Sequence, residues 1–331
     1  MTNRSAEITA FLTGARWVKA DRTHLAGDAS ARRYERLTLD NRTAILMDDP
    51  PGDGAGLAPF VEVADFLRQS SLSAPEIYAR DDATGLMLLE DFGDASFAKV
   101  ITADPAKERP LFEAAVDVLI DLHNTPCPPF VAPYTAEMMA DYIRPVFDFY
   151  APSDQRDAAL EADIIAQLQT LLTAHTPDTD VIILRDYHAE NLVWLPGREG
   201  VARVGLLDFQ DALAGHRAYD LISLLEDARR DVAPEVVAAM IDRYTAATDT
   251  DPDQFRAACA VQATQRNLRI LGVFARLARL RGKPHYIDLL PRVWGHLMSD
   301  LSHPIMADLQ PMIPRALPAP KPELREALKS A

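Results

Sequence analysis

The sequence is poor in cysteine, in positive charge and in long apolar runs. Its only two cysteines, Cys127 and Cys259, lie far apart and outside any Cys-x-x-Cys spacing, which indicates neither a disulfide framework nor a zinc site. The 34 Lys and Arg residues stand against 49 Asp and Glu residues, and the net charge of -15 disfavours nucleic acid or an anionic membrane as a partner. No segment approaches the roughly 20 apolar residues of a membrane-spanning helix.

The N-terminal segment also lacks the uninterrupted apolar core and the small-residue cleavage site of a secretory signal. Together with the sparse cysteines, this predicts a cytoplasmic protein that binds no membrane. The composition, with 48% hydrophobic and 25% charged residues, is that of a globular protein with a sizeable core.

The hydrophobic pattern changes near residue 92. Before that point, short apolar runs bounded by Gly, Pro, Asp or Asn predict strands at residues 33–39, 43–47 and 85–89, and residues 57–69 have the spacing of a helix. After it, amphipathic helical segments are expected near residues 111–123, 135–149, 158–174, 234–247 and 254–280. We therefore predict an α+β chain with two lobes, a sheet lobe at residues 1–92 and a mainly helical lobe at residues 93–331.

A brief return to strand interrupts the helical part, at residues 181–184, 191–195 and 201–209. The other unusual segment is the Pro-rich tail at residues 304–322, which we expect to be an extended strap or a loose end without a function of its own. The strand island is the part of the chain that carries chemistry.

Three oxygen-bearing side chains follow the strands of this island. Asp186 and Asn191 lie in the stretch RDYHAEN, and Asp208 follows the apolar strand VGLL. Phosphoryl transfer needs one carboxylate to orient the attacking hydroxyl and hard oxygen ligands to hold Mg²⁺. Each residue alone is more typical of a turn cap, but three of them at strand ends in this order favour a phosphotransferase site.

The stretch resembles the catalytic loop of the aminoglycoside phosphotransferase and choline kinase families, which are relatives of protein kinases. Their pattern is His-Gly-Asp, four residues, Asn, and then a strand that ends in Ile-Asp-Trp or Ile-Asp-Phe. The resemblance implies a protein-kinase-like two-lobed fold with a small antiparallel sheet in the N-terminal lobe, ATP and Mg²⁺ as cofactors, and a nucleotide-binding role for that lobe. It implies that Asp186 is the catalytic base or hydroxyl-orienting residue, that Asn191 and Asp208 hold Mg²⁺, and that Asp220 braces the loop.

Phosphate binding is expected in the turn LAGDASARRY at residues 25–34. Small side chains let backbone amides approach phosphate oxygens, and arginines add charge. This predicts a phosphate site made by Gly27, Ser30, Arg32 and Arg33.

The letters Asp91-Phe92-Gly93 match the magnesium motif of protein kinases, but they precede the catalytic loop instead of following it, so chain order excludes that role. The segment follows an apolar strand at the change from sheet to helix, where related kinases bind adenine by backbone hydrogen bonds. We therefore predict an adenine site at Glu90, Asp91 and Phe92.

The predicted strand at residues 43–47 corresponds to the third strand of kinase-like folds, but it lacks the lysine that binds the α and β phosphates there. Met47 stands at the corresponding position. Either Arg32 or Arg33 supplies the charge, or the protein is a regulatory pseudokinase that binds nucleotide without turnover. Glu62, at the place of the usual lysine partner, could pair with an arginine or be a surface carboxylate.

Segments over nearly the whole chain also resemble the bacterial N-acetylmuramate/N-acetylglucosamine anomeric kinases of cell-wall recycling. They are residues 27–34, 45–48, 265–274 and 282–294. This resemblance implies phosphate transfer to the anomeric hydroxyl of an amino sugar, and it makes the missing lysine a shared trait. The sugar contacts that we predict are Tyr187, His188, Gln210, Asp211, Arg266 and Arg269.

Several alternatives stay open at this point. Arg266 or Arg269 could receive the lactyl carboxylate of N-acetylmuramate, but an arginine on an amphipathic helix more often makes an internal salt bridge. An aminoglycoside, choline or homoserine kinase would have the same fold; no aromatic cluster that would bind choline stands out in the helical lobe. The sequence does not indicate an oligomeric state.

Overall fold

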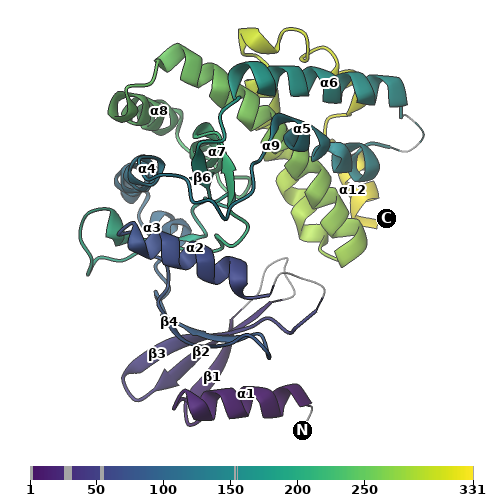
Figure 1. The fold of residues 1–331 in the computed structure, drawn as a ribbon. Coiled ribbons are helices and arrows are strands. Elements are labelled where there is room, and N and C mark those ends of the chain that lie inside the picture. Colours follow the sequence, from purple (N-terminus) through teal and green to yellow (C-terminus); the bar gives the residue numbers. More distant parts are fainter. Residues whose placement is uncertain (1–2, 26–31, 53–55, 153, 155, 331) are drawn as a thin grey trace. The chain divides into compact units, whose positions relative to one another are not determined.

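The computed structural model describes residues 3–25, 32–52, 56–152, 154 and 156–330 (Figure 1). The chain forms two compact units. The first consists of Met1–Ala114 and Glu190–Asp211, and the second of Ala115–Ala189 and Ala212–Ala331. We predict the lobe boundary between residues 92 and 93, whereas the first compact unit continues to Ala114 and also contains the later segment Glu190–Asp211.

The first unit contains a five-stranded antiparallel sheet with the strand order β1-β2-β3-β5-β4. Its strands are β1 (Asp21–Leu25), β2 (Arg33–Leu39), β3 (Arg42–Asp48), β4 (Ile77–Asp81) and β5 (Leu86–Leu89). The predictions for β2, β3 and β5 are confirmed. The sequence analysis misses β1 because its residues are mostly polar, and it misses β4 because this five-residue strand ends in Arg and Asp and has no continuous apolar run.

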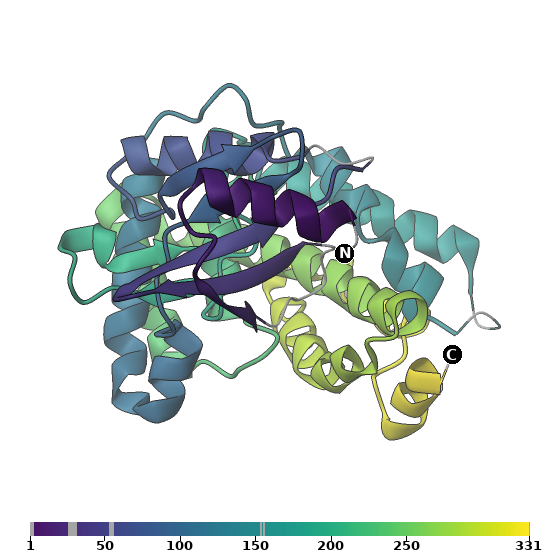
Figure 2. The same ribbon diagram turned by 90° about the horizontal axis from the view of Figure 1, so that it is seen from below.

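A helix lies on each face of this sheet, as Figure 1 shows. Ile8 and Leu12 of α1 (Asn3–Gly14) pack against Leu46 and Leu88, and Figure 2 shows α1 lying over the strands. The predicted helix α2 (Ala58–Gln69) covers the other face. Its buried residues recur at the three- and four-residue spacing of one helical face, and they are Phe60, Val61, Val63, Ala64 and Leu67.

A two-stranded hairpin completes the first unit. It is made by β7 (Leu192–Trp194) and β8 (Val204–Leu206), joined through the 3₁₀ turn Gly200–Arg203. Bridges from Ser73 to Gly205 and from Ser96 to Val193 attach the hairpin to the segment after α2 and to the start of α3 (Phe97–Ala103). The hairpin is therefore part of the same packed body as the sheet.

The second unit is mainly helical. Besides the C-terminal half of α4 (Glu108–His123), its helices are α5 (Ala136–Asp141), α6 (Ala158–His175), α7 (Ala218–Leu225), α8 (Pro234–Thr248), α9 (Pro252–Arg281), α10 (Leu290–Asp300), α11 (Ile313–Ala316) and α12 (Pro322–Ser330). Two short strands, β6 (Val181–Ile183) and β9 (Leu213–Gly215), pair antiparallel. Helix α9 is central, because α6, α7, α8, α10 and α12 all pack against it.

One predicted helical segment is broken. Residues 135–149 form α5 and then a π-helix at Val146–Tyr150, with Pro145 at the junction, where it removes a backbone donor. The π-helix lies so close to α9 that a Cβ added at Gly272 would stand 2.3 Å from the backbone nitrogen of Val146. Glycine is therefore required at this helix contact.

The prediction of an extended or loose C-terminal tail is wrong. Met306, Leu309, Ile313 and Leu317 are almost completely buried in the core of the second unit. Their spacing of three and four residues is helical, and the high proline content obscures it in the sequence. The hydroxyl of Tyr150 also donates a hydrogen bond of 2.6 Å to the carbonyl of Pro318.

Within the described part of the chain, no helix is both long and apolar enough to cross a membrane.

Candidate active site

The loop that carries Asp186 follows β6 in the second unit, and two side chains of α7 hold its backbone. Arg185, directly before Asp186, has a φ of 69°, which non-glycine residues seldom adopt. The carboxylate of Asp220 accepts hydrogen bonds from the backbone nitrogens of Leu184 (2.5 Å) and Arg185 (2.8 Å). The hydroxyl of Ser223 donates to the carbonyl oxygen of Arg185 at 3.2 Å. Two residues one helical turn apart thus fix the peptide unit that precedes Asp186.

The buried position of Asp220 disfavours the charged form of its carboxylate. The side chain is completely buried, and burial raises its pKa from 3.8 to about 7, although the two backbone hydrogen bonds act in the opposite direction. The negative charge of Asp186 adds to the rise. Asp220 therefore makes the contacts expected of a residue that braces the loop, and it lies within electrostatic reach of Asp186.

Tyr187 and His188, which we predict to be sugar contacts, are buried. The hydroxyl of Tyr187 donates to the carbonyl of Ala115 at 2.8 Å. His188 Nε2 lies 3.4 Å from a guanidinium nitrogen of Arg229, and burial, with the charges of Arg229 and Arg266, holds the His188 pKa well below its ordinary value. These contacts favour a structural role for both residues, and a sugar contact stays a prediction.

The two candidate arginines of α9 differ in their surroundings. Arg266 is buried and donates to the hydroxyl of Ser223 at 3.0 Å and to the carbonyl of Glu226 at 3.3 Å. Arg269 is only partly buried, donates to the hydroxyl of Tyr219 at 3.3 Å, and interacts electrostatically with Asp186. Arg266 therefore supports the helix that braces the loop, whereas Arg269 lies near Asp186 itself.

An aromatic group that the sequence analysis misses lies beside this loop. The ring of Tyr134 is 5.7 Å from the rings of both Tyr142 and Tyr219, and the guanidinium of Arg185 lies over it at 5.7 Å. Tyr142 is exposed. Tyr134 and Tyr142 are close in the chain, but Arg185 and Tyr219 come from distant segments, so no local pattern could have indicated the whole group.

The predicted magnesium ligands, Asn191 and Asp208, belong to the first unit. Leu192 is paired with Leu206 across the β7–β8 hairpin, and the backbone nitrogen of Leu207 donates to the carbonyl of Asn191 at 3.0 Å. Asn191 precedes β7 and Asp208 follows β8, so antiparallel pairing brings both residues to the same end of the hairpin.

The chemistry of this pair fits Mg²⁺, since an amide oxygen and a carboxylate oxygen are hard ligands that leave room for phosphate and water. The side chain of Gln210, a predicted sugar contact, donates to Asp208 Oδ1 at 2.7 Å. Asp211 is exposed. Among the described residues, no three His, Cys, Asp or Glu side chains form a metal site by themselves.

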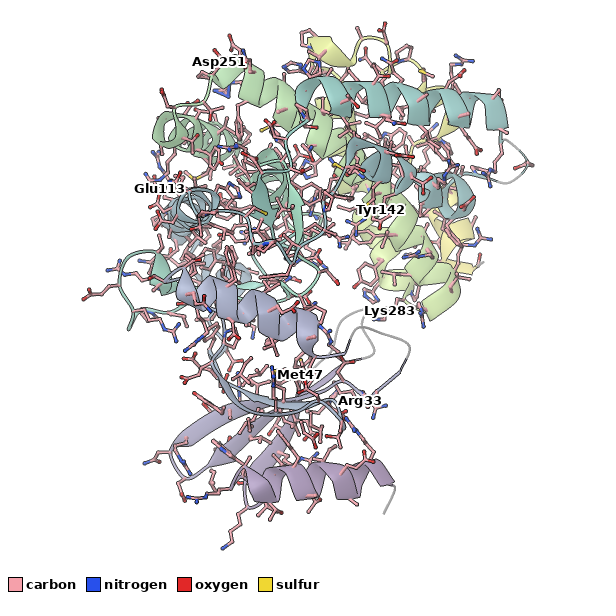
Figure 3. The ribbon with its side chains drawn as sticks, in the orientation of Figure 1. Arg33, Met47, Glu113, Tyr142, Asp251 and Lys283 are labelled. Carbon is pink, nitrogen blue, oxygen red and sulfur yellow. The ribbon has the colours of Figure 1, made fainter. Side chains whose placement is uncertain are left out.

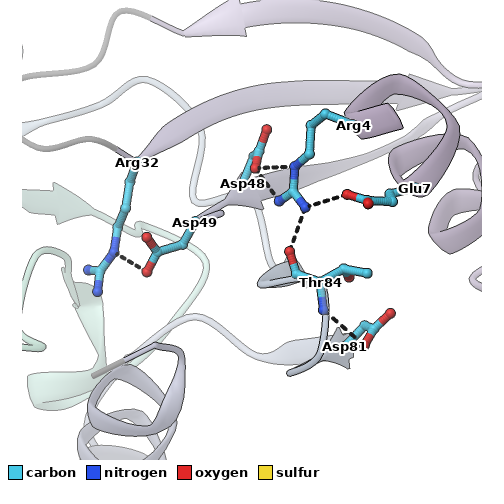
Figure 4. A network of polar contacts seen from close by, with 7 residues as sticks. All are labelled: Arg4, Glu7, Arg32, Asp48, Asp49, Asp81 and Thr84. Atoms are coloured by element: carbon cyan, nitrogen blue, oxygen red, sulfur yellow. Dashed lines mark hydrogen bonds and ion pairs between the residues drawn. The ribbon is translucent and has the colours of Figure 1, made fainter. Parts of the chain in front are cut away.

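The predicted phosphate turn is described only in part. Gly27 and Ser30 lie outside the described residues. Arg32 Nε is 3.0 Å from Asp49 Oδ2, in the ion pair drawn in Figure 4, and Arg33 is exposed at the start of β2. Figure 3 shows Arg33 at this end of the sheet and Met47 on β3, where Met47 is completely buried.

The predicted adenine segment has its side chains bound to other parts of the first unit. Asp91 makes an ion pair with Arg36 at 2.8 Å, and Arg198 binds Glu90 at 2.5 Å. The guanidinium of Arg198 also lies over the ring of Phe92, 5.1 Å from its centre. The side chains therefore have protein partners, and the backbone nitrogen of Glu90 donates to the carbonyl of Glu76 at 2.8 Å, so binding of adenine by the remaining backbone groups stays a prediction.

Comparison with known proteins places the chain in a family. Residues 21–258 match the model of the phosphotransferase enzyme family. The chain belongs to this family. It is 37% identical to the N-acetylmuramate/N-acetylglucosamine kinase of Caulobacter vibrioides, over 96% of this chain and 98% of that protein. It is 30% identical to the enzyme of the same name from Pseudomonas aeruginosa, over 86% and 85% of the two chains.

The fold is likewise similar to solved structures of such enzymes. The choline kinase of Streptococcus pneumoniae covers 90% of this phosphotransferase with a TM-score of 0.62, at 12% sequence identity, and its own chain is covered completely. The predicted protein-kinase-like fold and the predicted phosphotransferase family are therefore confirmed.

Proposed function

We propose that this phosphotransferase is an ATP- and Mg²⁺-dependent kinase that phosphorylates the anomeric hydroxyl of N-acetylmuramate and N-acetylglucosamine, and so forms sugar 1-phosphates. The observation that carries the choice of acceptor is the 37% identity, over 96% of the chain, to a protein named as a kinase of these two sugars. Such sugars arise when peptidoglycan is recycled. Because ATP is available in the cytoplasm, we propose that the reaction takes place there.

In this proposal, Asp186 orients the anomeric hydroxyl and accepts its proton. An anomeric hydroxyl is more acidic than an ordinary alcohol, so a carboxylate can accept the proton late in the reaction. Asp220 and Ser223 act on the backbone of Arg185, and they keep Asp186 in one orientation. Positioning of this kind supplies most of the catalysis in phosphoryl transfer.

Asn191 and Asp208 would hold Mg²⁺, in line with their shared end of the β7–β8 hairpin. When bound, Mg²⁺ neutralises phosphate charge and orients the phosphoryl group. Gln210 donates to Asp208 and would keep its carboxylate turned toward the metal. The backbone of residues 90–92 would bind adenine, because its side chains already have protein partners.

For the sugar, we favour Arg269 over Arg266 as the partner of the lactyl carboxylate. Arg266 is buried in contacts with Ser223 and Glu226, whereas Arg269 is partly exposed and lies within electrostatic reach of Asp186. Asp211, which is exposed, is the remaining candidate for a sugar hydroxyl. Replacing Arg269 by Gln would then weaken the binding of N-acetylmuramate but not that of N-acetylglucosamine, because N-acetylglucosamine has no carboxylate.

The proposal is tested by measuring phosphate transfer from ATP and Mg²⁺ to a panel of N-acetylmuramate, N-acetylglucosamine, choline, homoserine and kanamycin. We expect turnover of the two acetamido sugars, and a loss of about 100- to 10,000-fold in kcat for Asp186→Asn. Asp231→Asn, a change in an exposed ion pair with Arg292, is the control and keeps its activity. Turnover of choline or kanamycin alone would refute the proposed acceptor, and nucleotide binding without any turnover would indicate a pseudokinase.

A further inference from the structure

The position of the missing lysine defines one face of the sheet in the first unit. Side chains alternate between the two faces of a strand, and directly opposed residues of an antiparallel pair share a face. Leu46 packs against α1, so Met47 lies on the opposite face, which α2 covers in Figure 1. Tyr34 is paired with Met47 and shares this face. A cation that replaces the lysine must therefore be presented on the Tyr34 and Met47 side.

The two candidate arginines fall on opposite faces. Arg33 is paired with Asp48, and Asp48 binds Arg4 of α1, so this pair belongs to the α1 side. Figure 4 shows the Arg4 and Asp48 contacts apart from the ion pair of Arg32 with Asp49. Register thus separates two neighbouring arginines that the sequence could not distinguish.

Arg32 is fixed on the Met47 side by Asp49. The ion pair is 3.0 Å long, and only 17% of the Arg32 side chain and 20% of the Asp49 side chain are exposed. Asp49 is itself held, because its backbone nitrogen donates to the carbonyl of Gly85 at 2.9 Å and so extends the pairing of β3 with β5. The guanidinium is therefore anchored to the end of the paired strands β3 and β5.

The surroundings of Arg32 lead to the predicted metal ligand. Burial disfavours the charged guanidinium, but the hydrogen bond with Asp49 and the charges of Tyr34, Asp49 and Asp211 outweigh it and raise the pKa of Arg32. Tyr34, in turn, interacts with both Arg32 and Asp208. Within the first unit, Arg32 is thus within electrostatic reach of Asp211 and, through Tyr34, of the predicted metal ligand Asp208.

We propose that Arg32, held by Asp49, binds the nucleotide phosphates in place of the absent strand lysine, and that Arg33 does not. The inference rests on the proposed kinase function. A guanidinium has five N–H donors in a planar fork, so it can hold a carboxylate through Nε and bind phosphate oxygens as well. The ion pair between Arg32, just before β2, and Asp49, just after β3, then replaces the usual pair of a strand lysine with a helix glutamate, and Glu62, which is exposed on α2, has no such role.

The test is calorimetric binding of ADP and of adenosine to the full chain in the presence of Mg²⁺. For Arg32→Ala we expect ADP binding to weaken about 10- to 100-fold, the loss expected for one charged hydrogen-bonding partner, while adenosine affinity stays within about twofold. Arg33→Ala should bind both ligands as the wild type does. Arg22→Ala, which removes an ion pair between Arg22 of β1 and Glu35 of β2, controls for the loss of any arginine from this sheet.

A selective loss of ADP affinity in Arg33→Ala, with Arg32→Ala unchanged, would overturn the inference and leave the kinase proposal intact. If Arg32→Ala weakened adenosine binding as well, the variant Arg32→Gln would test the inference instead, because a glutamine side chain can still donate a hydrogen bond to Asp49. The inference requires weak ADP binding with normal adenosine binding in that variant, and an equal loss of both ligands contradicts it. A wild type that binds neither ligand would refute the proposed function itself.

Discussion

The two compact units hold their functional residues in different ways. In the first unit, partly exposed ion pairs do this work, such as those of Arg198 with Glu90 and of Arg32 with Asp49. In the second unit, the loop of Asp186 is held by backbone hydrogen bonds to Asp220, which has no exposed surface. Exposed ion pairs contribute little because water competes for both partners, whereas removing one partner of a buried polar contact leaves the other unsatisfied. The second unit should therefore be far more sensitive to single polar substitutions.

The largest effect is expected for Asp220→Ala. This change leaves the backbone nitrogens of Leu184 and Arg185 without their acceptor in a buried place, and it should lower the free energy of unfolding by about 4 kcal/mol. Urea denaturation measures this value. In the control Asp231→Ala, the lost carboxylate has an 83% exposed side chain and pairs with Arg292, so a change of only about 0.5 kcal/mol is expected. Because both residues belong to the second unit, equal effects of the two variants would show that burial does not set the cost of losing a carboxylate.

The pH dependence of stability sharpens the same contrast. Burial raises the pKa of Asp220 from 3.8 to about 7, so the folded protein keeps this proton when the unfolded chain has already lost it. The stability contributed by Asp220 is therefore complete below about pH 4 and falls by about 4 kcal/mol as the pH rises to 7. Subtracting the unfolding free energies of Asp220→Asn from those of the wild type at each pH isolates this effect. A difference that rises with pH would have the wrong sign.

A smaller loss is expected from overpacking in the second unit. Gly272→Ala places a methyl group 2.3 Å from the backbone of Val146, which should destabilise the protein by about 2 kcal/mol. Gly295→Ala, in helix α10, meets no atom within 4 Å and should be neutral or stabilise by about 0.5 kcal/mol. Thermal unfolding of the two variants gives this comparison, and a neutral Gly272→Ala would show that the contact of α9 with the π-helix can relax.

The smallest effect is expected in the first unit. Arg198→Ala removes the ion pair with Glu90 and the contact with the ring of Phe92, and should cost about 1 kcal/mol. Because salt screens partly exposed charges, this cost should shrink in about 1 M NaCl, whereas that of Asp220→Ala should not. Urea denaturation at low and high salt measures both. A salt-independent loss in Arg198→Ala would mean that packing, not charge, holds the segment at residues 90–92.

Much of the fold is evident from local patterns in the sequence. Strands β2, β3 and β5 and helices α2, α6, α8 and α9 lie within a few residues of their predicted positions, because apolar residues recur at the period of the element. Helix α7 gives no such signal, since every residue from Ala218 to Leu225 is buried and no polar side marks a period. The sequence therefore conceals the helix that holds the loop of Asp186.

The candidate site also has a part that local sequence patterns predict and a part that they do not. The order of Asp186, Asn191 and Asp208 is local and could be predicted, as could the resemblance that gives each a role. The choice between Arg32 and Arg33 depends on strand register, which one residue of slippage would reverse. The group of Tyr134, Tyr142 and Tyr219 depends on long-range packing, so it could not be predicted.

The position of phosphate on the product tests the central claim most directly. Wild type and Asp186→Asn are incubated with ATP, Mg²⁺ and N-acetylglucosamine, and the product is analysed by ³¹P NMR, with N-acetylglucosaminitol, which has no anomeric hydroxyl, as the control acceptor. The account predicts a sugar 1-phosphate formed by the wild type, a loss of about 100-fold or more in rate with Asp186→Asn, and no transfer to the alditol. Phosphate on another hydroxyl, or equal rates for the two proteins, would contradict it.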